Sequence, residues 1–234
     1  IMIQKNTLNK EPIKVKRALL SVFDKNNIID IGKALIDNEI EILSTGGTAD
    51  ALRNNNINVT DVSDYTHFPE IMDGRIKTIN PLIEGGILGL RDDHEKEAKE
   101  NSIKWIDLVI CNLYPFSDVI SRENCDVSLA LENIDIGGPT MIRSAAKNVG
   151  WVCVVVDPLD YTIIINELIN NSTISYETRK HLSAKAFGHT AQYDSIIHDY
   201  FKDEQLSDNL TLTYKKKSNL RYGENPHQSA SSYT

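Results

Sequence analysis

The chain has 234 residues, enough for one large domain or for one domain and part of a second. Its hydrophobic and charged fractions of 41% and 25% are those of a globular domain, and no apolar run is long enough to cross a bilayer. Its net charge of −8 argues against a nucleic-acid binder, so an anionic small ligand would need a pocket where cations and backbone N–H groups are concentrated.

Apolar runs and amphipathic segments alternate through the first part of the chain. Residues 1–16 are polar and basic, and we expect them to be frayed. The hydrophobic pattern then predicts strands and helices in turn: a strand over 17–23, a helix over 28–38, a strand over 41–45, a helix over 48–55 and a strand over 59–63.

The later part of the chain holds two strongly apolar runs, 105–114 and 151–157, which predict buried strands. The remaining predictions are helices over 93–101, 128–134 and 140–148, a long helix or helix pair over 176–203, and a linker at 215–218. Alternating strands and helices predict an α/β fold, a parallel sheet with helices on both faces. Such sheets bind ligands at the carboxyl ends of their strands, so we expect one shared site there.

The turn Ser44-Thr45-Gly46-Gly47-Thr48 follows the second predicted strand and precedes a helix. Glycines let the backbone approach an anion, and the first N–H groups and the dipole of the helix favour negative charge there. The turn therefore predicts a phosphate site, although Gly and Thr also occur in such turns merely for tight geometry.

Two further segments carry cations and hydroxyls. Ser21 and Lys25 end the first predicted strand, where taken alone they are better explained as a solvated strand end. In Arg75-Ile76-Lys77-Thr78, alternation places both cations on one side of an extended segment. Spacing alone favours an oxyanion site and an exposed basic turn about equally.

Polar groups also close the apolar run 105–114 and precede the helix predicted at 140–148. Asn112 and Tyr114 emerge where the strand ends, and a tyrosine there can donate a proton or simply be packed with its hydroxyl satisfied. Asp135 precedes the turn Gly137-Gly138-Pro139, and Lys147 falls on the helix that follows. The structural alternative is a helix corner with a surface lysine.

Cysteines and histidines give no sign of a metal site. Cys111, Cys125 and Cys153 are an odd set without metal-ligand spacing, and the histidines show no such spacing with a carboxylate. Cys111 and Cys153 lie in apolar runs, so we interpret them as buried free thiols. With no visible signal peptide, we expect a cytoplasmic protein with no membrane or nucleic-acid partner.

Together these segments resemble the amino-terminal part of the bifunctional purine biosynthesis family, which combines AICAR transformylase with IMP cyclohydrolase. The resemblance runs from Arg17 to Gln228 and rests on SVFDK, STGGTADALR, DVSDYTHFPEIMDGRIKT, CNLYPF, IDIGGPTMIRSAAKN and RYGENPHQ, in the family's order. It implies a methylglyoxal-synthase-like α/β fold with a carboxy-terminal helical extension. It places the cyclohydrolase domain at 12–210 and a linker with the start of the transformylase domain at 211–234.

The resemblance implies ring closure of formyl-AICAR, a purine nucleotide precursor, to IMP with loss of water and without a metal or organic cofactor. Lys77 would stabilise developing negative charge, Asp135 and Lys147 would handle protons, and Tyr114 would be the acid. The residues implied in substrate and phosphate binding are Ser21, Lys25, Ser44, Thr45, Gly46, Gly47, Thr48, Arg75, Thr78, Asn112, Gly137 and Gly138.

The family also implies a homodimer for the full-length protein and 10-formyltetrahydrofolate as cosubstrate of its transformylase domain. We expect this chain to be a fragment without transformylase activity, in which Arg221 and Tyr222 lack the rest of their substrate site. Two residues depart from the family's usual pattern: Phe23 stands where Ser is common, and Asn80 where His is common.

Two other functions remain open. One is a regulatory module of the same fold that binds phosphorylated ligands without chemistry, and the other is methylglyoxal synthase. Asp135, Lys147 and Tyr114 favour an enzyme over a module, because mere binding needs no proton-transfer groups. The helical extension and RYGENPHQ do not suit methylglyoxal synthase.

Overall fold

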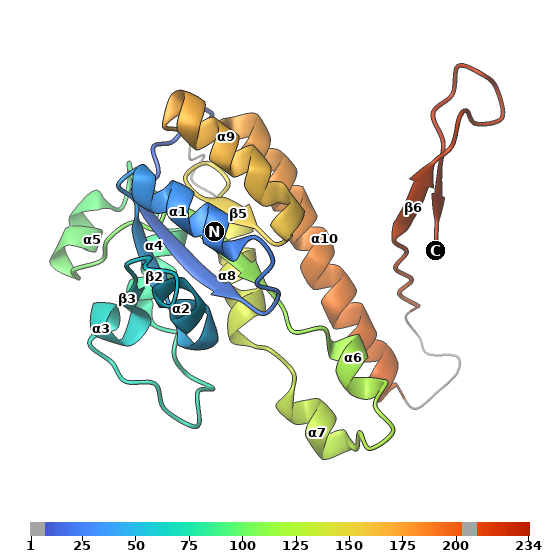
Figure 1. Cartoon of the computed structure of the whole chain (residues 1–234), viewed down its shortest axis with the longest axis horizontal. Coiled ribbons are helices and arrows are strands. Elements are labelled where there is room, and N and C mark those ends of the chain that lie inside the picture. The colour runs from blue at the N-terminus through green and yellow to red at the C-terminus, as the bar shows by residue number, and fades with distance from the viewer. Residues whose placement is uncertain (1–7, 203–209) are drawn as a thin grey trace, which may run out of the picture. The chain divides into compact units, whose positions relative to one another are not determined.

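Five parallel strands form the sheet at the centre of the computed structural model, which describes residues 8–202 and 210–234 (Figure 1). In the order of the sheet they are β3 (Thr60–Asp61), β2 (Glu41–Ser44), β1 (Arg17–Val22), β4 (Leu108–Asn112) and β5 (Cys153–Val155). The chain builds outward from β1 to β3 and then crosses back to β4 on the other side of β1. The predicted parallel sheet is confirmed.

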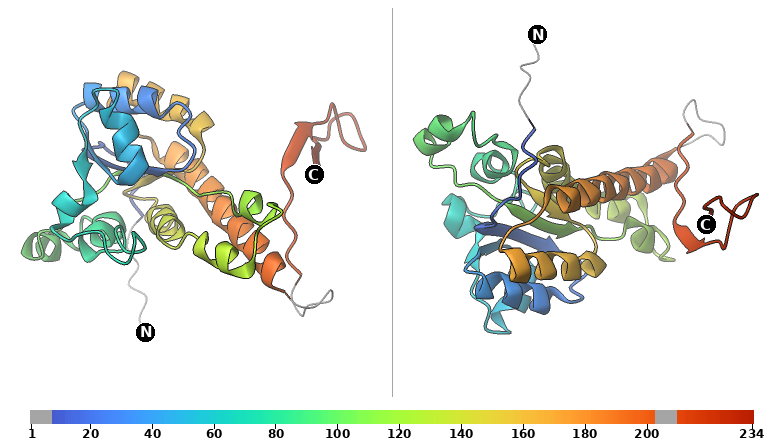
Figure 2. Two further views of the ribbon diagram at one scale, coloured as in Figure 1. Left: turned by 60° about the horizontal axis from the view of Figure 1, so that its bottom comes forward. Right: turned by 90° about the horizontal axis from the view of Figure 1, so that it is seen from above.

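Helices cover both faces of this sheet, as predicted. Figure 2 shows α1 (Ile28–Asp37) and α9 (Tyr161–Asn171) together on one face, and α2 (Gly46–Arg53) packs against α1. On the other face, α8 (Gly137–Lys147) packs on β4 and β5, and α4 (Pro81–Leu88) packs on α8. The remaining helices are α3 (Val62–Thr66), α5 (Glu95–Glu100), α6 (Phe116–Ile120), α7 (Val127–Glu132), the 3₁₀ turn η1 (Pro158–Asp160) and α10 (Tyr176–Phe201).

Side-chain alternation along the strands divides the core between the two faces. Ala18, Leu20 and Val22 of β1 join the large apolar cluster under α1 and α9, whereas Leu19 points to the opposite face. Both faces of β1 are therefore buried. This explains why the strand reads as a continuous apolar run rather than as an alternating one.

Helix α4 was not predicted. Its start is well specified, since Asn80 accepts a hydrogen bond from the Leu82 N–H at 2.9 Å and Pro81 is the first helical residue. Gly85 and Gly86 weaken the helical pattern, but a Cβ on Gly86 would lie 2.6 Å from the Lys104 carbonyl oxygen. Close packing of α4 on the chain before β4 thus requires glycine at position 86, and glycine is a residue that argues against a helix when only the sequence is considered.

Strand β3 is shorter than the predicted strand 59–63. It spans two residues, because Val62 begins α3 and the chain turns away from the sheet. The glycines of the turn after β2 are also helical rather than extended, so α2 begins at Gly46 and not at the predicted residue 48.

The amino-terminal segment is packed against the domain, so the prediction of a frayed 1–16 is wrong for residues 8–16, while 1–7 lie outside the described residues. Ile13 and Val15 are buried, and Ile13 exchanges backbone hydrogen bonds with Ile174. Nearby, Arg179 is fully buried, and its guanidinium carbon lies 5.7 Å from the centre of the Tyr176 ring. Its guanidinium donates to the carbonyl oxygens of Glu11, Val149, Gly150 and Ile174.

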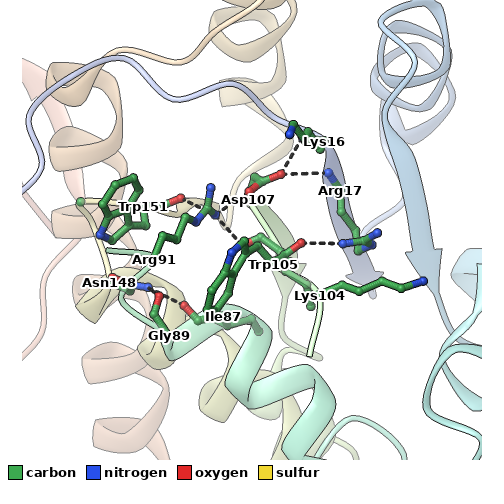
Figure 3. A network of polar contacts seen from close by, with 12 residues as sticks. Lys16, Arg17, Ile87, Gly89, Arg91, Lys104, Trp105, Asp107, Asn148 and Trp151 are labelled. Atoms are coloured by element: carbon green, nitrogen blue, oxygen red, sulfur yellow. Dashed lines mark hydrogen bonds and ion pairs between the residues drawn. The ribbon is translucent and has the colours of Figure 1, made fainter. Parts of the chain in front are cut away.

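A network around Asp107 fixes the strands at the edge opposite their carboxyl ends (Figure 3). The buried Asp107 accepts hydrogen bonds from the backbone N–H groups of Lys16 and Arg17 at 2.6 and 3.0 Å. Its second oxygen pairs with Arg91, which also donates to the Trp151 carbonyl oxygen at 3.0 Å. One buried carboxylate thereby joins the beginnings of β1, β4 and the segment before β5.

Chain contacts divide the protein into two units, residues 1–190 and 191–234. The second unit begins within α10 and contains an antiparallel pair, β6 (Lys216–Asn219) and β7 (Ser231–Tyr233). The linker predicted at 215–218 is therefore mostly strand, and the domain boundary at 210 stays a prediction. Among the described helices, none combines the length and the apolar character needed to cross a membrane.

Glu84 on α4 gives a prediction about pH. Burial raises the pKa of Glu84 above its ordinary value of 4.5, and the hydrogen bond from Ser144 lowers it only in part. The stability that this carboxyl contributes is thus complete below pH 4.5 and is lost as the pH rises through the folded-state pKa. We expect Glu84→Gln to unfold at higher urea concentration than the wild type at pH 7, with the difference vanishing near pH 4. Glu123→Gln is the control, because Glu123 is exposed. Its urea unfolding midpoint should stay close to that of the wild type at both pH values.

Candidate functional site

A cavity of about 680 Å³ opens at the carboxyl ends of β1, β2 and β4. This edge is where the chain passes from β1 to strands on either side, the position at which parallel sheets bind ligands. Most of the predicted site residues line it: Ser21, Lys25, Thr45, Gly46, Gly47, Thr48, Arg75, Lys77, Thr78, Asn112, Tyr114, Asp135, Gly137 and Gly138. The structure thus gathers segments that are far apart in the sequence around one hollow.

One wall of the cavity is the start of α2. Thr45 is extended, and Gly46 follows with a φ of 48°, a left-handed conformation that glycine adopts without a steric penalty. A Cβ added to Gly47 would lie 3.9 Å from Lys25 Nζ. The ammonium of the loop after β1 therefore lies close to the first turn of α2, and the two together favour an anion.

Two hydroxyls of the same turn have structural partners. Ser44 is fully buried, does not line the cavity, and donates to the Leu20 carbonyl oxygen at 2.7 Å. The Thr48 hydroxyl donates to the Val22 carbonyl oxygen and accepts from the Val22 N–H, both at 3.0 Å. The role of Ser44 in phosphate binding stays a prediction, and in this structure its hydroxyl ties β2 to β1.

The start of α8 forms another part of the cavity lining. Asp135 accepts a hydrogen bond from the Gly138 N–H at 2.9 Å. A Cβ on Gly138 would lie 2.4 Å from Asp135 Oδ2 and 2.5 Å from Leu113 Cδ2, and one on Gly137 would lie 2.9 Å from Thr78 Oγ1. The double glycine thus lets a carboxylate, a hydroxyl and a helix N-terminus meet at the cavity.

Replacement by alanine should have opposite effects on stability at a crowded glycine, Gly138, and at an uncrowded one, Gly188. We expect Gly138→Ala to lower the free energy of unfolding by about 1–3 kcal/mol, because the added methyl overpacks the turn. Gly188→Ala, inside α10 where a Cβ would meet nothing within 4 Å, should instead raise it by about 0.5–1 kcal/mol. Urea unfolding of both variants measures the difference. If Gly138→Ala is as stable as the wild type, Asp135 and Leu113 do not crowd this position as the structure indicates.

Asn112 shapes the cavity through the neighbouring loop. Its side-chain oxygen accepts from the N–H groups of Phe23 and Asp24 at 2.8 and 2.9 Å, and its amide donates to the Asp24 carbonyl oxygen at 3.1 Å. Tyr114, two residues further on, packs edge-to-face on Phe23 and accepts a hydrogen bond from Arg122. The end of β4 therefore holds the end of β1 in place.

Cys111 lies buried in β4. Burial raises the pKa of the Cys111 thiol far above its usual range, and the nearby Asp135 carboxylate raises it further. Cys111 and Cys153 are both buried free thiols, as predicted.

Lys77 and Arg75 come from the loop before α4. Arg75 pairs with Glu132 at the end of α7, and both residues line the cavity. Within the described part of the chain, the Lys77 ammonium has no carboxylate within ion-pair distance. Lys77 is therefore the cation of this loop that is available to a ligand.

Lys147 is not brought to the cavity. It is exposed in the last turn of α8, and ten residues of helix separate it from Gly137, roughly 15 Å at the usual rise. The predicted pairing of Lys147 with Asp135 is thus absent within one chain. Arg221 and Tyr222 belong to the second unit, and their substrate role stays a prediction. No cluster of metal-ligating side chains occurs in residues 8–202 and 210–234.

Several lining residues were not predicted as site residues. They are Val22, Phe23, Asp73, Gly74, Leu131, Glu132, Ile134, Ile136 and Met141. Asp73 and Gly74 directly precede the predicted basic segment, so the sequence offered a signal for them. Leu131 and Glu132 of α7 had no such signal in the sequence, because only the fold brings that helix to the cavity.

Comparisons with known proteins match both parts of the chain. Residues 27–140 match the MGS-like domain, and residues 145–234 match the AICARFT/IMPCHase bienzyme. The relative from Lysinibacillus sphaericus, named bifunctional purine biosynthesis protein PurH, is 51% identical over 93% of this chain and 43% of its own length. Proteins of the same name from Halalkalibacterium halodurans and Bacillus cereus are 49% identical over 93% of this chain and 44% of their own length.

A solved structure shares the fold. The crystal structure of ForH superposes with a TM-score of 0.73 at 31% identity, over 80% of this chain and all of the other. The chain spans less than half the length of the curated relatives that it matches. The matches nevertheless cover both the sheet domain and the carboxy-terminal segment, so this chain belongs to the AICARFT/IMPCHase bienzyme family and carries that family's MGS-like domain.

Proposed function

We propose that this chain is an IMP cyclohydrolase, which closes formyl-AICAR to IMP with loss of water. The observation that carries the proposal is one cavity with an anion-binding wall and a wall of proton-transfer groups. Its volume of about 680 Å³ lies within the usual range of small-molecule sites.

The phosphate end of the substrate binds at the first wall. Lys25 and the N–H groups at the start of α2 contribute positive charge and hydrogen-bond donors, and Ser21 adds a hydroxyl. The hydroxyls of Ser44 and Thr48 act indirectly, by fixing the position of this turn. Phosphate binding thereby places the heterocycle toward α8.

Ring closure takes place at the second wall. The carboxamide nitrogen attacks the formyl carbon, a C–N bond forms, and negative charge develops on the formyl oxygen. Lys77 and the first N–H groups of α8 stabilise that charge. Both reacting groups belong to one molecule, so holding the cyclising conformer removes much of the entropic barrier.

Proton transfers complete the reaction. Asp135 accepts the proton that the carboxamide nitrogen loses, and Tyr114 donates a proton to the formyl oxygen, which gives a carbinolamine. The formamide nitrogen then loses its N–H proton, a C=N bond forms, the C–O bond breaks, and the oxygen takes a second proton and leaves as water. Two protons thus leave the two nitrogens and two arrive on the departing oxygen. Each group returns to its starting state once protons are exchanged with solvent, so the balance needs no oxidant or cofactor. We assign Lys147 no substrate contact within one chain, because it lies in the last turn of α8.

For a longer form of this chain, we propose a second activity, the formyl transfer to AICAR from 10-formyltetrahydrofolate. That form would include the rest of the site to which Arg221 and Tyr222 belong. We also propose that it is a cytoplasmic homodimer. Expression of the longer form, followed by a transformylase assay and measurement of its mass in solution, tests these points together.

The cyclohydrolase proposal is tested by incubating the purified chain with formyl-AICAR. We expect the ultraviolet spectrum of IMP to appear in proportion to enzyme concentration, and mass spectrometry to show the loss of one water. Tight binding of formyl-AICAR without turnover would support the regulatory module instead. No IMP above the uncatalysed rate would refute the proposal.

A further inference from the structure

Phe23 is an exposed aromatic side chain inside a polar cavity. It follows β1, lines the hollow beside Lys25, and keeps 48% of its surface accessible. Its ring meets the ring of Tyr114 with centroids 4.3 Å apart and planes at 76°. This edge-to-face arrangement is the one that aromatic quadrupoles favour, so the contact is specific rather than a chance apposition.

The backbone of Phe23 is fixed independently of its side chain. The Asn112 side chain accepts from the Phe23 N–H at 2.8 Å, and Asn112 is only two residues before Tyr114. These contacts form a closed loop. Asn112 bonds the Phe23 backbone, the Phe23 ring packs on Tyr114, and Tyr114 is joined to Asn112 through the chain. Such a loop of contacts leaves the Tyr114 ring little freedom to rotate away from the cavity.

The hydroxyl of Tyr114 is held from another side. Arg122, in the turn after α6, donates to the phenol oxygen. Phe23 thus restrains the ring and Arg122 restrains the polar end, from segments on either side of the tyrosine. A catalytic acid gains from such restraint, because proton transfer depends on its distance and angle to the acceptor.

We propose that Phe23 is a positioning residue that orients Tyr114 toward the reacting end of the substrate. This rests on the proposed function, in which Tyr114 donates a proton.

The proposal differs in its kinetic signature from direct ligand contact. A ring that only packs against substrate contributes to binding, so its loss raises KM. A ring that orients the acid acts in the transition state, so its loss lowers kcat while KM changes little. The two roles are therefore separable by steady-state kinetics.

The test compares Phe23→Leu and Phe23→Tyr in the cyclohydrolase assay. We expect Phe23→Leu to lose about three- to tenfold in kcat, because it keeps apolar volume but removes the aromatic contact, with KM within about twofold. Phe23→Tyr retains a ring and should keep kcat within about twofold. Phe201→Leu is the matched control, since Phe201 also packs edge-to-face on a tyrosine, Tyr200, but belongs to the second unit and not to the sheet domain.

A second readout does not depend on activity. The aromatic NMR resonances of Tyr114, assigned with Tyr114→Phe, should shift in Phe23→Leu, because the ring current of the neighbouring phenylalanine is lost, and stay unchanged in Phe201→Leu. If the wild type is inactive but these resonances shift, the proposed function fails and the contact stands. An active enzyme whose kcat is unchanged in Phe23→Leu, whose KM alone rises, or whose Phe23→Tyr variant loses kcat would overturn the positioning role.

Discussion

Replacement of Lys77 by alanine is expected to reduce cyclohydrolase turnover by about 10²- to 10³-fold. Lys77 lines the cavity and forms no ion pair with the described carboxylates, so its charge is available to the oxyanion that develops as the ring closes. Arg75, its neighbour in the loop, already pairs with Glu132. Stopped-flow measurement of a single turnover, at saturating enzyme, isolates the chemical step from product release.

Lys217→Ala is the control for this experiment. Lys217 is equally cationic but lies exposed on β6, so its loss should leave turnover within about twofold. Lys77→Arg keeps the charge while changing the geometry of the donor, and we expect an intermediate loss. Turnover of Lys77→Ala that equals that of Lys217→Ala would remove Lys77 from the mechanism.

Much of the candidate site was predictable because its parts follow strand ends. Glycine and hydroxyl residues after β2, a lysine after β1 and a tyrosine after β4 are local signals, and a parallel sheet places all three at one edge. The sequence did not determine the partner of each hydroxyl. Ser44 turns inward to Leu20, a choice that depends on how closely β1 and β2 lie together.

Helix packing produced the clearest failures. The predicted helix 140–148 already placed Lys147 at the end far from Asp135, but the sequence hides the true start of α8, which lies three residues earlier at Gly137. It likewise hides α4, whose glycines are needed for contact with the chain before β4. In both places tertiary contact sets the helix bounds, and local propensity contributes little.

The contact between Phe23 and Tyr114 illustrates the same limit within the site. Each residue was noticed separately, one as a departure from the family's usual serine and the other as a candidate acid. Only the pairing of β1 with β4, which sets Val22 opposite Asn112, brings the two rings together. A sequence pattern can indicate the chemistry at a strand end, but the register decides which neighbour orients it.

Asp135→Asn is expected to lower turnover by about 10²- to 10⁴-fold with little change in stability. The reason is that the Asp135 carboxylate has two separable tasks. As a hydrogen-bond acceptor it satisfies the Gly138 N–H at 2.9 Å, and as a base it takes the carboxamide proton. Asparagine retains an oxygen for the first task but cannot perform the second.

Asp135→Ala removes both tasks at once, so the pair of variants separates them. We expect the alanine variant to lose activity to the same degree as the asparagine variant and, in addition, about 1 kcal/mol of unfolding free energy, because the first turn of α8 loses a side-chain acceptor. Urea unfolding and single-turnover kinetics on the same preparations measure the two losses independently. Full activity in Asp135→Asn would mean that the carboxylate serves only to begin the helix, and the proton would then have to leave through another group of the cavity.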